Sequence, residues 1–383
     1  MSLPKSYPCT ILPANNYHFI RLVSSKQLSV SKQERINRLY SFSFPDELEL
    51  YPCSLIDIIP RNLESVMRDF FESNSLYIDD DLTRQAHKEY IFTPDFPHVP
   101  KCEMMLWDLV SQYFDLNAII DETISKKLVF FIMNNEERDI FKTLDFSSIR
   151  FRVVDVFRKF KSISISIPQL INLPILNPRT FSICSYRKCD LIVQDVLETR
   201  QDPITNVNTV IYGVTSGMLR ELSSSLGNVL KPYLDRQGLV CARISQSPFM
   251  KVLTSQKHLV IISIGAGFSS ILPLIRYRQK QNIDTPITLF LNTRNSDDLG
   301  YLQKQIIDGP SQNLRVLVAT GQPASVSIIE NAEVFTEDTQ LVYAGRSSVL
   351  LEIKDLVIQM YDENGADGEQ KVDEIIKYTW IRD

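Results

Sequence analysis

The chain has 383 residues, of which 44% are hydrophobic and 23% are charged, a composition typical of a folded protein with more than one core. Its 41 lysines and arginines against 46 aspartates and glutamates leave a formal net charge of -5, which argues against bulk attraction to nucleic acid phosphates. We therefore expect two or three domains and no nucleic acid partner.

The start of the chain and its apolar runs give no sign of secretion or of a membrane. No apolar run reaches the roughly 18 residues that span a bilayer, and "MSLPKSYPCTILPANN" lacks the charged and apolar regions of a secretory signal. We expect a cytoplasmic protein that does not bind a membrane. The six cysteines are scattered without Cys-x-x-Cys spacing, and His98 with Cys102 is too small a set for a metal site. Free thiols and no metal are expected.

Residues 17 to 60 contain short runs typical of β-strands, separated by turn-like segments. "YHFIRLVSS" and "RLYSFSF" have the length and the β-branched or aromatic content of strands. Between residues 61 and 165 the apolar side chains instead recur three and four apart, as in "NLESVMRDFFES", which is typical of amphipathic helices. The pattern predicts barrel strands in the first region and a helical insert in the second.

Strands return after residue 166, in "RTFSICS" and "CDLIVQDVL". From residue 251 onward, short apolar strands alternate with helical stretches, beginning with "KHLVIISIG" and "SSILPLIRYRQKQ". This alternation favours a parallel sheet with helices on both faces. We therefore predict an antiparallel β-barrel over residues 1–60 and 166–250, an α-helical insert over residues 61–165, and an α/β doubly wound domain over residues 251–383.

The segment "NPRTFSICSY" (residues 177–186) places an arginine, an aromatic ring and a hydroxyl on one predicted strand. Because side chains alternate along a strand, Arg179 and Phe181 share one face, and Ser182 points to the other face or ends the strand. A guanidinium can hold phosphate, a ring can stack on a flavin, and a hydroxyl can bond a ring nitrogen. The three side chains indicate a flavin nucleotide site, and an edge strand with an incidental arginine is the competing interpretation.

Two glycine-containing stretches precede predicted helices, where free backbone amides can bind an anion. In "GVTSGMLREL", Gly213 comes before a threonine and a serine, which suit either a pyrophosphate site or an ordinary helix cap. In "IISIGAGFSS", a strand runs through Gly265 and Gly267 into a helix. Such a turn can bring phosphates to the carboxyl end of a parallel sheet, or it can serve packing alone.

In this order the stretches resemble the FAD- and NADP-binding half of the diflavin reductases, whose catalytic part is of the ferredoxin-NADP reductase type. The likeness is strongest to the NADPH-dependent diflavin oxidoreductase family. It runs over nearly the whole chain, from "LWDLVSQYFDLNAI" through "NPRTFSICS", "GVTSGMLREL" and "ISIGAGFSSILPLI" to "VYAG". The resemblance implies a β-barrel FAD domain, a helical connecting insert and a nucleotide-binding α/β domain.

The resemblance also implies electron transfer from NADPH or NADH through FAD to a separate FMN-containing or iron-sulfur acceptor protein of the anamorsin type, in cytosolic iron-sulfur cluster assembly. FMN is not expected on this chain, because nothing like the family's flavodoxin-like domain precedes residue 17. By position, Ser182 would sit beside flavin N5 and Trp380 would cover the flavin face, the two roles expected to matter for catalysis. The remaining expected FAD contacts are Arg179, Phe181, Leu191, Val193, Gly213, Val214, Thr215 and Ser216, and those to NADP are Gly265, Gly267 and Arg294.

Several positions depart from the family pattern. The family turn Gly-x-Gly-Thr-Gly reads "GAGFS" here, and we expect the bulky Phe268 to hinder close approach of a dinucleotide. Thr320 and Gly321 stand where a serine-arginine pair grips the 2'-phosphate, so preference for NADPH over NADH loses its main charge-assisted contact. On the flavin side, Asp195 interrupts an apolar strand. The second interpretation is therefore an interaction protein that holds FAD but no longer uses NADPH.

Overall fold

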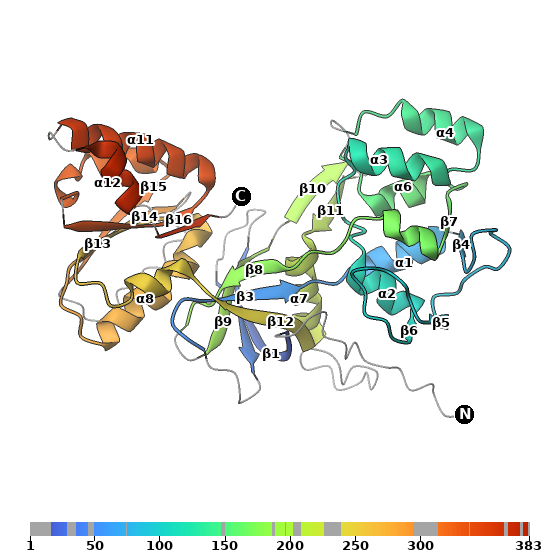
Figure 1. Cartoon of the computed structure of the whole chain (residues 1–383), viewed down its shortest axis with the longest axis horizontal. Coiled ribbons are helices and arrows are strands. Elements are labelled where there is room, and N and C mark those ends of the chain that lie inside the picture. Colours follow the sequence, from blue (N-terminus) through green and yellow to red (C-terminus); the bar gives the residue numbers. More distant parts are fainter. Residues whose placement is uncertain are drawn as a thin grey trace. The chain divides into compact units, whose positions relative to one another are not determined.

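The structure of the chain is a computed structural model (Figure 1). By their internal contacts, the residues divide into two compact units. The first consists of residues 1–19, 58–179 and 196–243, and the second of residues 20–57, 180–195 and 244–383. The sequence also predicts a helix in "DDLGYLQKQII", which lies outside the described residues. These are residues 17–28, 36–44, 50–73, 75–146, 150–185, 188–195, 197–201, 208–225, 239–293, 313–336, 338–363, 367–375 and 378–381.

The first unit is mainly helical between residues 61 and 165, as the spacing of its apolar residues predicts. Three short two-stranded sheets accompany the helices, and one more helix, α7, follows the last of them. The helices are α1 (Glu64–Ser73), α2 (Leu106–Tyr113), α3 (Glu122–Leu128), α4 (Asn135–Lys142), α6 (Val153–Lys159) and α7 (Val214–Ser225), with the 3-10 helices η1 (Val129–Phe131) and η2 (Pro168–Asn172). The strand pairs are β4 (Ser75–Tyr77) with β7 (Ser164–Ser166), β5 (Ile91–Phe92) with β6 (Met104–Met105), and β10 (Leu197–Gln201) with β11 (Asn208–Tyr212).

Local side chains start two of these helices. The Asp121 carboxylate accepts a hydrogen bond from the amide of Ile124 at 2.7 Å, and so caps α3. The Asn134 side chain accepts from the amides of Glu136 and Glu137, at 2.8 and 3.1 Å, and caps α4. Beneath the caps, aromatic rings pack edge to face, among them Phe70 with Phe157 at 4.9 Å and Phe141 with Phe160 at 5.3 Å between centroids.

A six-stranded sheet carries most of the barrel strands that the sequence predicts. Its order is β8-β3-β12-β1-β2-β9, and the ladders of β1 with β2 and of β2 with β9 are antiparallel. An antiparallel bridge between Ile183 and Leu191 connects the two ends of this order, so the sheet curls back on itself. The strands are β1 (His18–Gln27), β2 (Asn37–Ser43), β3 (Ser54–Ile59), β8 (Arg179–Ser182), β9 (Cys189–Gln194) and β12 (Leu239–Gln246).

The second unit also contains a parallel sheet in the order β15-β14-β13-β16-β17. The first strand, β13, lies in the middle, with the second and third strands on one side of it and the fourth and fifth on the other. Its strands are β13 (His258–Ile264), β14 (Ile287–Thr293), β15 (Leu314–Thr320), β16 (Thr339–Gly345) and β17 (Tyr378–Ile381). The connections are η4 (Pro248–Val252), η5 (Gly265–Gly267), α8 (Phe268–Lys280), α10 (Ala324–Ile329), η6 (Ala332–Val334), α11 (Ser347–Glu363) and α12 (Gly368–Ile375).

Both faces of the parallel sheet are covered, which explains the continuous apolar runs of its strands. Leu259 and Ile261 of β13 belong to a core cluster with residues of α8. Val260 and Ile262, which alternate with them, belong to a second cluster with residues of α11. Figure 1 shows α8 on one side of this sheet and α11 with α12 on the other. The doubly wound arrangement expected from the alternation of strands and helices is therefore present.

A buried arginine fixes the segment between the two sheets. The side chain of Arg278 on α8 is 1% exposed, and its Nη1 donates to the backbone oxygens of Val252, Leu253 and Ser255, at 3.3, 3.4 and 2.8 Å. Its Nη2 donates to the hydroxyl of Thr285. Backbone carbonyls thus take the place of a carboxylate partner, and they hold the end of η4 against α8.

Candidate functional site

Arg179 begins β8 with its guanidinium half exposed. Its Nη1 donates to the backbone oxygen of Asn177 at 2.9 Å, and its Nη2 lies 3.9 Å from a carboxylate oxygen of Asp115. Burial raises the pKa of Asp115, and the positive charge of Arg179 acts in the opposite direction. Since 45% of the arginine side chain is exposed, the guanidinium retains donors that a phosphate could use.

The next residues of β8 run from the surface into the interior. Arg179 and Thr180 are exposed, and Phe181 and Ser182 are buried, so exposure follows the direction of the strand and does not alternate between its faces. The Thr180 hydroxyl donates to Asp57 on β3 at 2.6 Å, which secures the strand. The ring of Phe181 is 5% exposed, so it would present its face to a flavin only after its neighbours are displaced.

On this strand, the hydroxyl of Ser182 gives the strongest indication of a bound ligand. The residue is 7% exposed, and its Oγ has no hydrogen-bond partner among the described residues. A buried hydroxyl without a partner is unfavourable by about 1 to 3 kcal/mol. A bound ligand could supply the missing hydrogen bond to this atom. This fits the expectation that Ser182 sits beside a nitrogen of the flavin.

Leu191 and Val193, which are expected to contact FAD through their backbone, lie on β9. Both side chains are buried, and the two residues pair with Tyr40 and Arg38 of β2. Besides this pairing, β9 has the bridge from Leu191 to Ile183, and the backbone of Asp190 bonds the Cys184 amide at 2.8 Å and the Ser185 hydroxyl at 3.2 Å. An edge strand keeps backbone groups that its neighbour does not use, so β9 is able to offer them to a ligand.

Asp195, which interrupts the apolar pattern of β9, has a partner far away in the sequence. One carboxylate oxygen accepts from Nε of Arg38 at 2.9 Å, and the carboxylate is 1% exposed. Its other oxygen, Oδ1, has no hydrogen-bond partner within the described ranges. The interruption is therefore a buried ion pair between β2 and the end of β9, which the sequence alone did not indicate.

The stretch from Gly213 to Ser216 forms the first turn of α7. The carbonyl of Gly213 accepts from the amide of Gly217 at 2.7 Å and from the Ser216 hydroxyl at 3.4 Å. Thr215 is buried, and its Oγ1 has no partner in the part of the chain that the structure describes. Val214 is half-buried in the same turn. In this stretch, the Thr215 hydroxyl is thus the group that could still form a hydrogen bond to a ligand. The Ser182 hydroxyl is in the same situation on β8.

The glycine turn η5 joins the end of β13 to α8. Gly265 has a φ of 55°, a left-handed conformation that favours glycine, and no atom lies within 4 Å of the position its Cβ would take. A Cβ on Gly267 would instead clash with the carbonyl oxygen of Ala344 on β16 and lie 2.7 Å from the carbonyl carbon. The first glycine therefore provides an open turn, and the second allows this turn to rest on β16.

Phe268, which was expected to hinder a dinucleotide, points away from the turn's surface. Its side chain is 1% exposed and packs in the core cluster with Ile271 and Leu272 of α8. The ring therefore serves the core under the helix. Close approach to the turn is governed by Gly265 and Gly267 and not by the size of residue 268.

The region expected to hold a 2'-phosphate has no cation in its described residues. Thr320 ends β15 and is exposed, and Gly321 follows with a φ of 71°. The Ser325 hydroxyl donates to the carboxylate of Glu352 on α11 at 2.5 Å. Arg294, expected near the adenosine, lies outside the described residues. An acidic partner for Ser325 makes this part of the surface less suited to a phosphate.

The expected terminal aromatic residue lies on β17. Trp380 pairs with Ala344 of β16, the residue on which the glycine turn rests. β17 also contacts η4, and η5 contacts both β16 and β9. The second unit therefore brings the strand with Leu191 and Val193, the glycine turn and the backbone of Trp380 into one neighbourhood.

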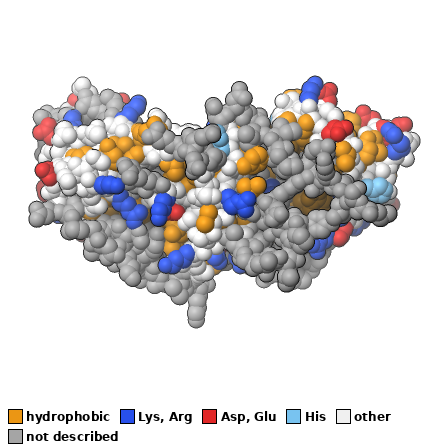
Figure 2. Space-filling view, turned by 90° about the horizontal axis from the view of Figure 1, so that it is seen from below, with side chains coloured by type: hydrophobic (Ala, Val, Ile, Leu, Met, Phe, Trp, Pro, Cys, Tyr) orange, Lys and Arg blue, Asp and Glu red, His pale blue; other side chains and the backbone are white. Residues whose placement is uncertain are grey.

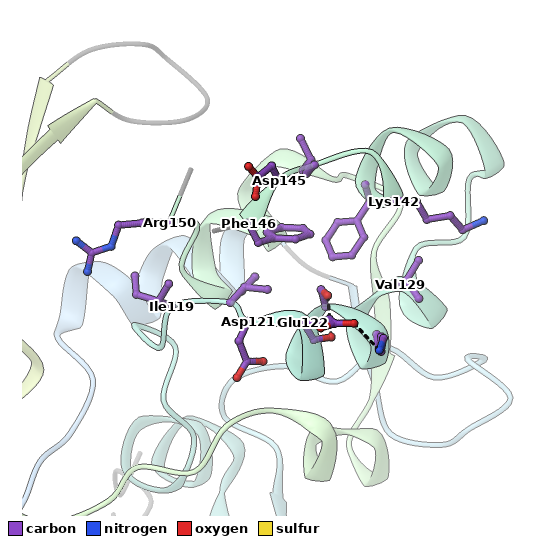
Figure 3. Close-up of a pocket in the computed structure, with 13 residues that line it drawn as sticks. Ile119, Asp121, Glu122, Val129, Lys142, Asp145, Phe146 and Arg150 are labelled. Atoms are coloured by element: carbon purple, nitrogen blue, oxygen red, sulfur yellow. Dashed lines mark hydrogen bonds and ion pairs between the residues drawn. The ribbon is translucent and has the colours of Figure 1, made fainter. Parts of the chain in front are cut away.

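An open pocket lies elsewhere, in the helical part of the first unit (Figure 3). It has a volume of about 700 Å³ and contains none of the residues singled out from the sequence. The rings of Phe141 and Phe146 form part of its wall, and Glu122 pairs with Lys126 at 2.7 Å on its rim. Its side chains come from α3, α4 and the loops beside them, a grouping that helical periodicity alone does not reveal.

Three of the described cysteines, Cys53, Cys184 and Cys189, are buried thiols outside any disulfide. Burial raises the pKa of Cys184 to about 12, helped by the negative charge of Asp190. It also raises the pKa values of Cys53 and Cys189 well above the usual range. Thiols with such pKa values stay protonated at neutral pH and are poor nucleophiles, so these cysteines offer no thiolate chemistry.

Three other features were considered for the described residues: a metal site, a membrane-spanning helix and a continuous basic surface. Within them, no set of three or more histidine, cysteine, aspartate and glutamate side chains is grouped to hold a metal ion. None of the helices in the described ranges is long and apolar enough to cross a membrane. Figure 2 shows lysine and arginine side chains in several separate places on the face that it draws, and not as one continuous basic surface.

Comparison with known proteins adds one distant relative. No protein-family model matches the chain. It is 21% identical over 411 residues to a Gibberella zeae protein named NADPH-dependent diflavin oxidoreductase 1. The match covers 97% of this chain and 65% of that protein, so the chain spans about two thirds of the relative's length. The chain is thus similar, at low identity but over nearly all of its residues, to a protein named for a diflavin oxidoreductase activity that depends on NADPH.

Proposed function

We propose that the chain is a FAD-dependent reductase that takes electrons from NADPH or NADH and passes them to a separate acceptor protein. The observation that carries the proposal is the contact of η5 with both β9 and β16. Hydride transfer requires the nicotinamide to meet the flavin, so a nucleotide turn must lie next to a flavin strand. The similarity to a protein named as an NADPH-dependent diflavin oxidoreductase supports the same reading.

Two features of the described residues fit a flavin site, and one does not. The buried hydroxyls of Ser182 and Thr215 have no partner among the described residues, and they fit positions where a cofactor supplies the missing hydrogen bond. The half-exposed guanidinium of Arg179 suits a pyrophosphate. Phe181 fits less readily, because its ring is buried. The bound FAD would supply acceptance of a hydride and release of single electrons, and the protein would supply placement and shielding.

The acceptor is proposed from the family resemblance. An FMN-containing or iron-sulfur protein of the anamorsin type, in cytosolic iron-sulfur cluster assembly, would take the electrons singly. FMN itself is proposed to belong to that separate protein and FAD to this chain. A cytoplasmic location belongs to the same proposal.

The residues expected to bind the 2'-phosphate of NADPH suggest a second candidate function. The bond of Ser325 to Glu352, together with Thr320 and Gly321 in place of a serine-arginine pair, weakens the case for a 2'-phosphate. A protein that holds FAD without using NADPH, and acts through interactions, accounts for this. The two functions differ in whether a nicotinamide nucleotide reduces the bound flavin.

Anaerobic titration separates the two functions. The purified chain is reconstituted with FAD, and NADPH or NADH is added without oxygen while the flavin absorbance is followed. Bleaching supports the reductase, and a flavin that stays oxidised supports the interaction protein. A chain that binds no flavin after reconstitution would contradict both.

Replacement of Arg179 by alanine is expected to weaken FAD binding by about tenfold or more. A charge-assisted hydrogen bond to phosphate is worth about 1.5 to 3 kcal/mol, and alanine removes the donors of the guanidinium. Binding is measured by flavin fluorescence during titration of the apoprotein. The control is Arg150→Ala, which removes another exposed arginine, paired with Glu198 at 3.0 Å. Equal FAD affinity in both variants would remove Arg179 from the site.

Replacement of Trp380 by alanine is expected to change kcat/KM for NADH and for NADPH alike, by about threefold to tenfold. The reason is that a ring stacked on the flavin competes with the nicotinamide, and such stacking is worth about 0.5 to 1.5 kcal/mol. Trp107→Phe is the control, because Trp107 is the other tryptophan of the chain and stacks on Phe71 in the insert. Unchanged kcat/KM values for both nucleotides would mean that Trp380 does not cover the flavin.

A further inference from the structure

The carboxyl ends of β13 and β16 form the place where the strand order of the parallel sheet reverses. The chain continues from β13 to β14 and β15 on one side, and returns to β16 and β17 on the other. In sheets of this kind, a dinucleotide binds at the reversal, with its diphosphate at the turn after the first strand. The strand ends lie close together, since a Cβ on Gly345 would come within 2.9 Å of Cγ1 of Ile264.

Arg346 stands at this reversal with a fixed backbone and an exposed side chain. It follows Gly345, the last residue of β16, and precedes α11. Its carbonyl oxygen accepts from the hydroxyl of Tyr343 at 2.7 Å and from the amide of Leu350 at 3.1 Å. Tyr343 is fully buried, so the start of the arginine side chain is held in place while its guanidinium remains free to reach a ligand.

Arg346 is an exposed cation at the carboxyl edge of the parallel sheet. The stretches that directly follow β13 and β15 contain no charged residue, as "GAG" and "GQP" show. No described carboxylate forms an ion pair with Arg346. By contrast, Arg315 near the start of β15 pairs with Glu333 at 3.2 Å and bonds Asn331 at 2.7 Å. No described carboxylate therefore competes for this cation with an anion that comes from outside the chain.

We propose that Arg346 binds the diphosphate of the nicotinamide dinucleotide from the β16 side, opposite the backbone of the glycine turn. This inference rests on the proposed function and names one residue that would bind the nucleotide. The diphosphate is favoured over a 2'-phosphate because the adenosine end of such a ligand lies over the second strand, here β14, on the other side of β13. Arg346 thus supplies a charge-assisted contact that NADH and NADPH share.

Calorimetric binding of ADP-ribose and of its 2'-phosphate derivative, with no redox reaction involved, tests the role of Arg346. Arg346→Ala is expected to weaken both ligands by the same factor, about tenfold to a hundredfold, because both contain the diphosphate. Arg346→Lys keeps the charge and is expected to restore part of the affinity. Arg315→Ala is the control, because it removes a cation from the opposite edge of the same sheet. Because Arg346 is exposed, its variants are expected to melt at the wild-type temperature.

Three results would overturn the role of Arg346. These are unchanged ADP-ribose affinity in Arg346→Ala, a loss confined to the 2'-phosphate derivative, and no binding of ADP-ribose by the wild-type chain. Flavin retention and anaerobic bleaching, measured separately, distinguish this from a failure of the reductase proposal. A chain that bleaches while Arg346→Ala binds ADP-ribose normally loses only the arginine's role. A chain without flavin whose ADP-ribose binding depends on Arg346 loses only the reductase function.

Discussion

Gly267→Ala is expected to lower the free energy of unfolding of the second unit by about 3 kcal/mol, the upper end of the usual penalty for overpacking. The new Cβ would clash with the carbonyl oxygen of Ala344 and lie 2.7 Å from its carbonyl carbon. Both are backbone atoms in the middle of the parallel sheet, so no side-chain rotation can relieve the clash. The measurement is urea denaturation followed by circular dichroism.

Gly265→Ala is the matched control for this clash. It adds the same methyl group two residues earlier in the same turn, where no atom lies within 4 Å of it. Its only penalty is the left-handed backbone at φ 55°, about 1 to 2 kcal/mol for a residue with a Cβ. Equal destabilisation by the two substitutions would contradict the close packing of η5 on β16.

The two glycines show how a motif can be identified while its physical reason is not. From the sequence, both were expected to cradle a phosphate, and packing was the simpler alternative. In the structure, Gly267 is required by its contact with β16 whether or not a nucleotide binds, whereas Gly265 opens an uncrowded turn. Gly265 is accordingly the more specific indication of a ligand, since nothing in its packing demands the turn it makes.

Local pattern predicted the elements because it depends on neighbours in the chain. The run "KHLVIISIG" became β13 and "SSILPLIRYRQKQ" became α8, since a continuous apolar strand and a three-and-four spacing each point to one conformation. The strand order and the bridge from Ile183 to Leu191 were not predictable in this way. They depend on which distant strands pair, and a single sequence carries no record of that pairing.

The candidate site was also predictable from the sequence only in part. Arg179 and Ser182 were singled out because their chemistry is visible in the residue types, and the structure then showed that the Ser182 hydroxyl lacks a described partner. The ion pair of Asp195 with Arg38 was missed, because the two residues are 157 positions apart and meet only through the register of β2 with β9. The cavity in the insert was missed because it arises where several helices and loops meet.

Ser182→Ala is expected to slow reduction of the bound flavin by NADPH or NADH by about a hundredfold, the lower end of the usual range for a positioned proton donor. A hydroxyl beside the reacting nitrogen can stabilise the charge that develops as hydride arrives, and alanine removes it. The same change is expected to leave the stability of the apoprotein equal or slightly higher, because it removes a buried hydroxyl without a described partner. Stopped-flow absorbance gives the rate, and thermal denaturation gives the stability.

Ser54→Ala on the neighbouring strand β3 should give the opposite pair of results. Its hydroxyl is buried as well, but it donates to the backbone oxygen of Tyr51 at 2.9 Å. Removing a satisfied hydrogen bond is expected to cost about 1 kcal/mol of stability and to leave the rate of flavin reduction unchanged. If Ser182→Ala destabilises the apoprotein as Ser54→Ala does and reduces flavin at the wild-type rate, the Ser182 hydroxyl is structural. The buried hydroxyl would then have to be explained by packing alone.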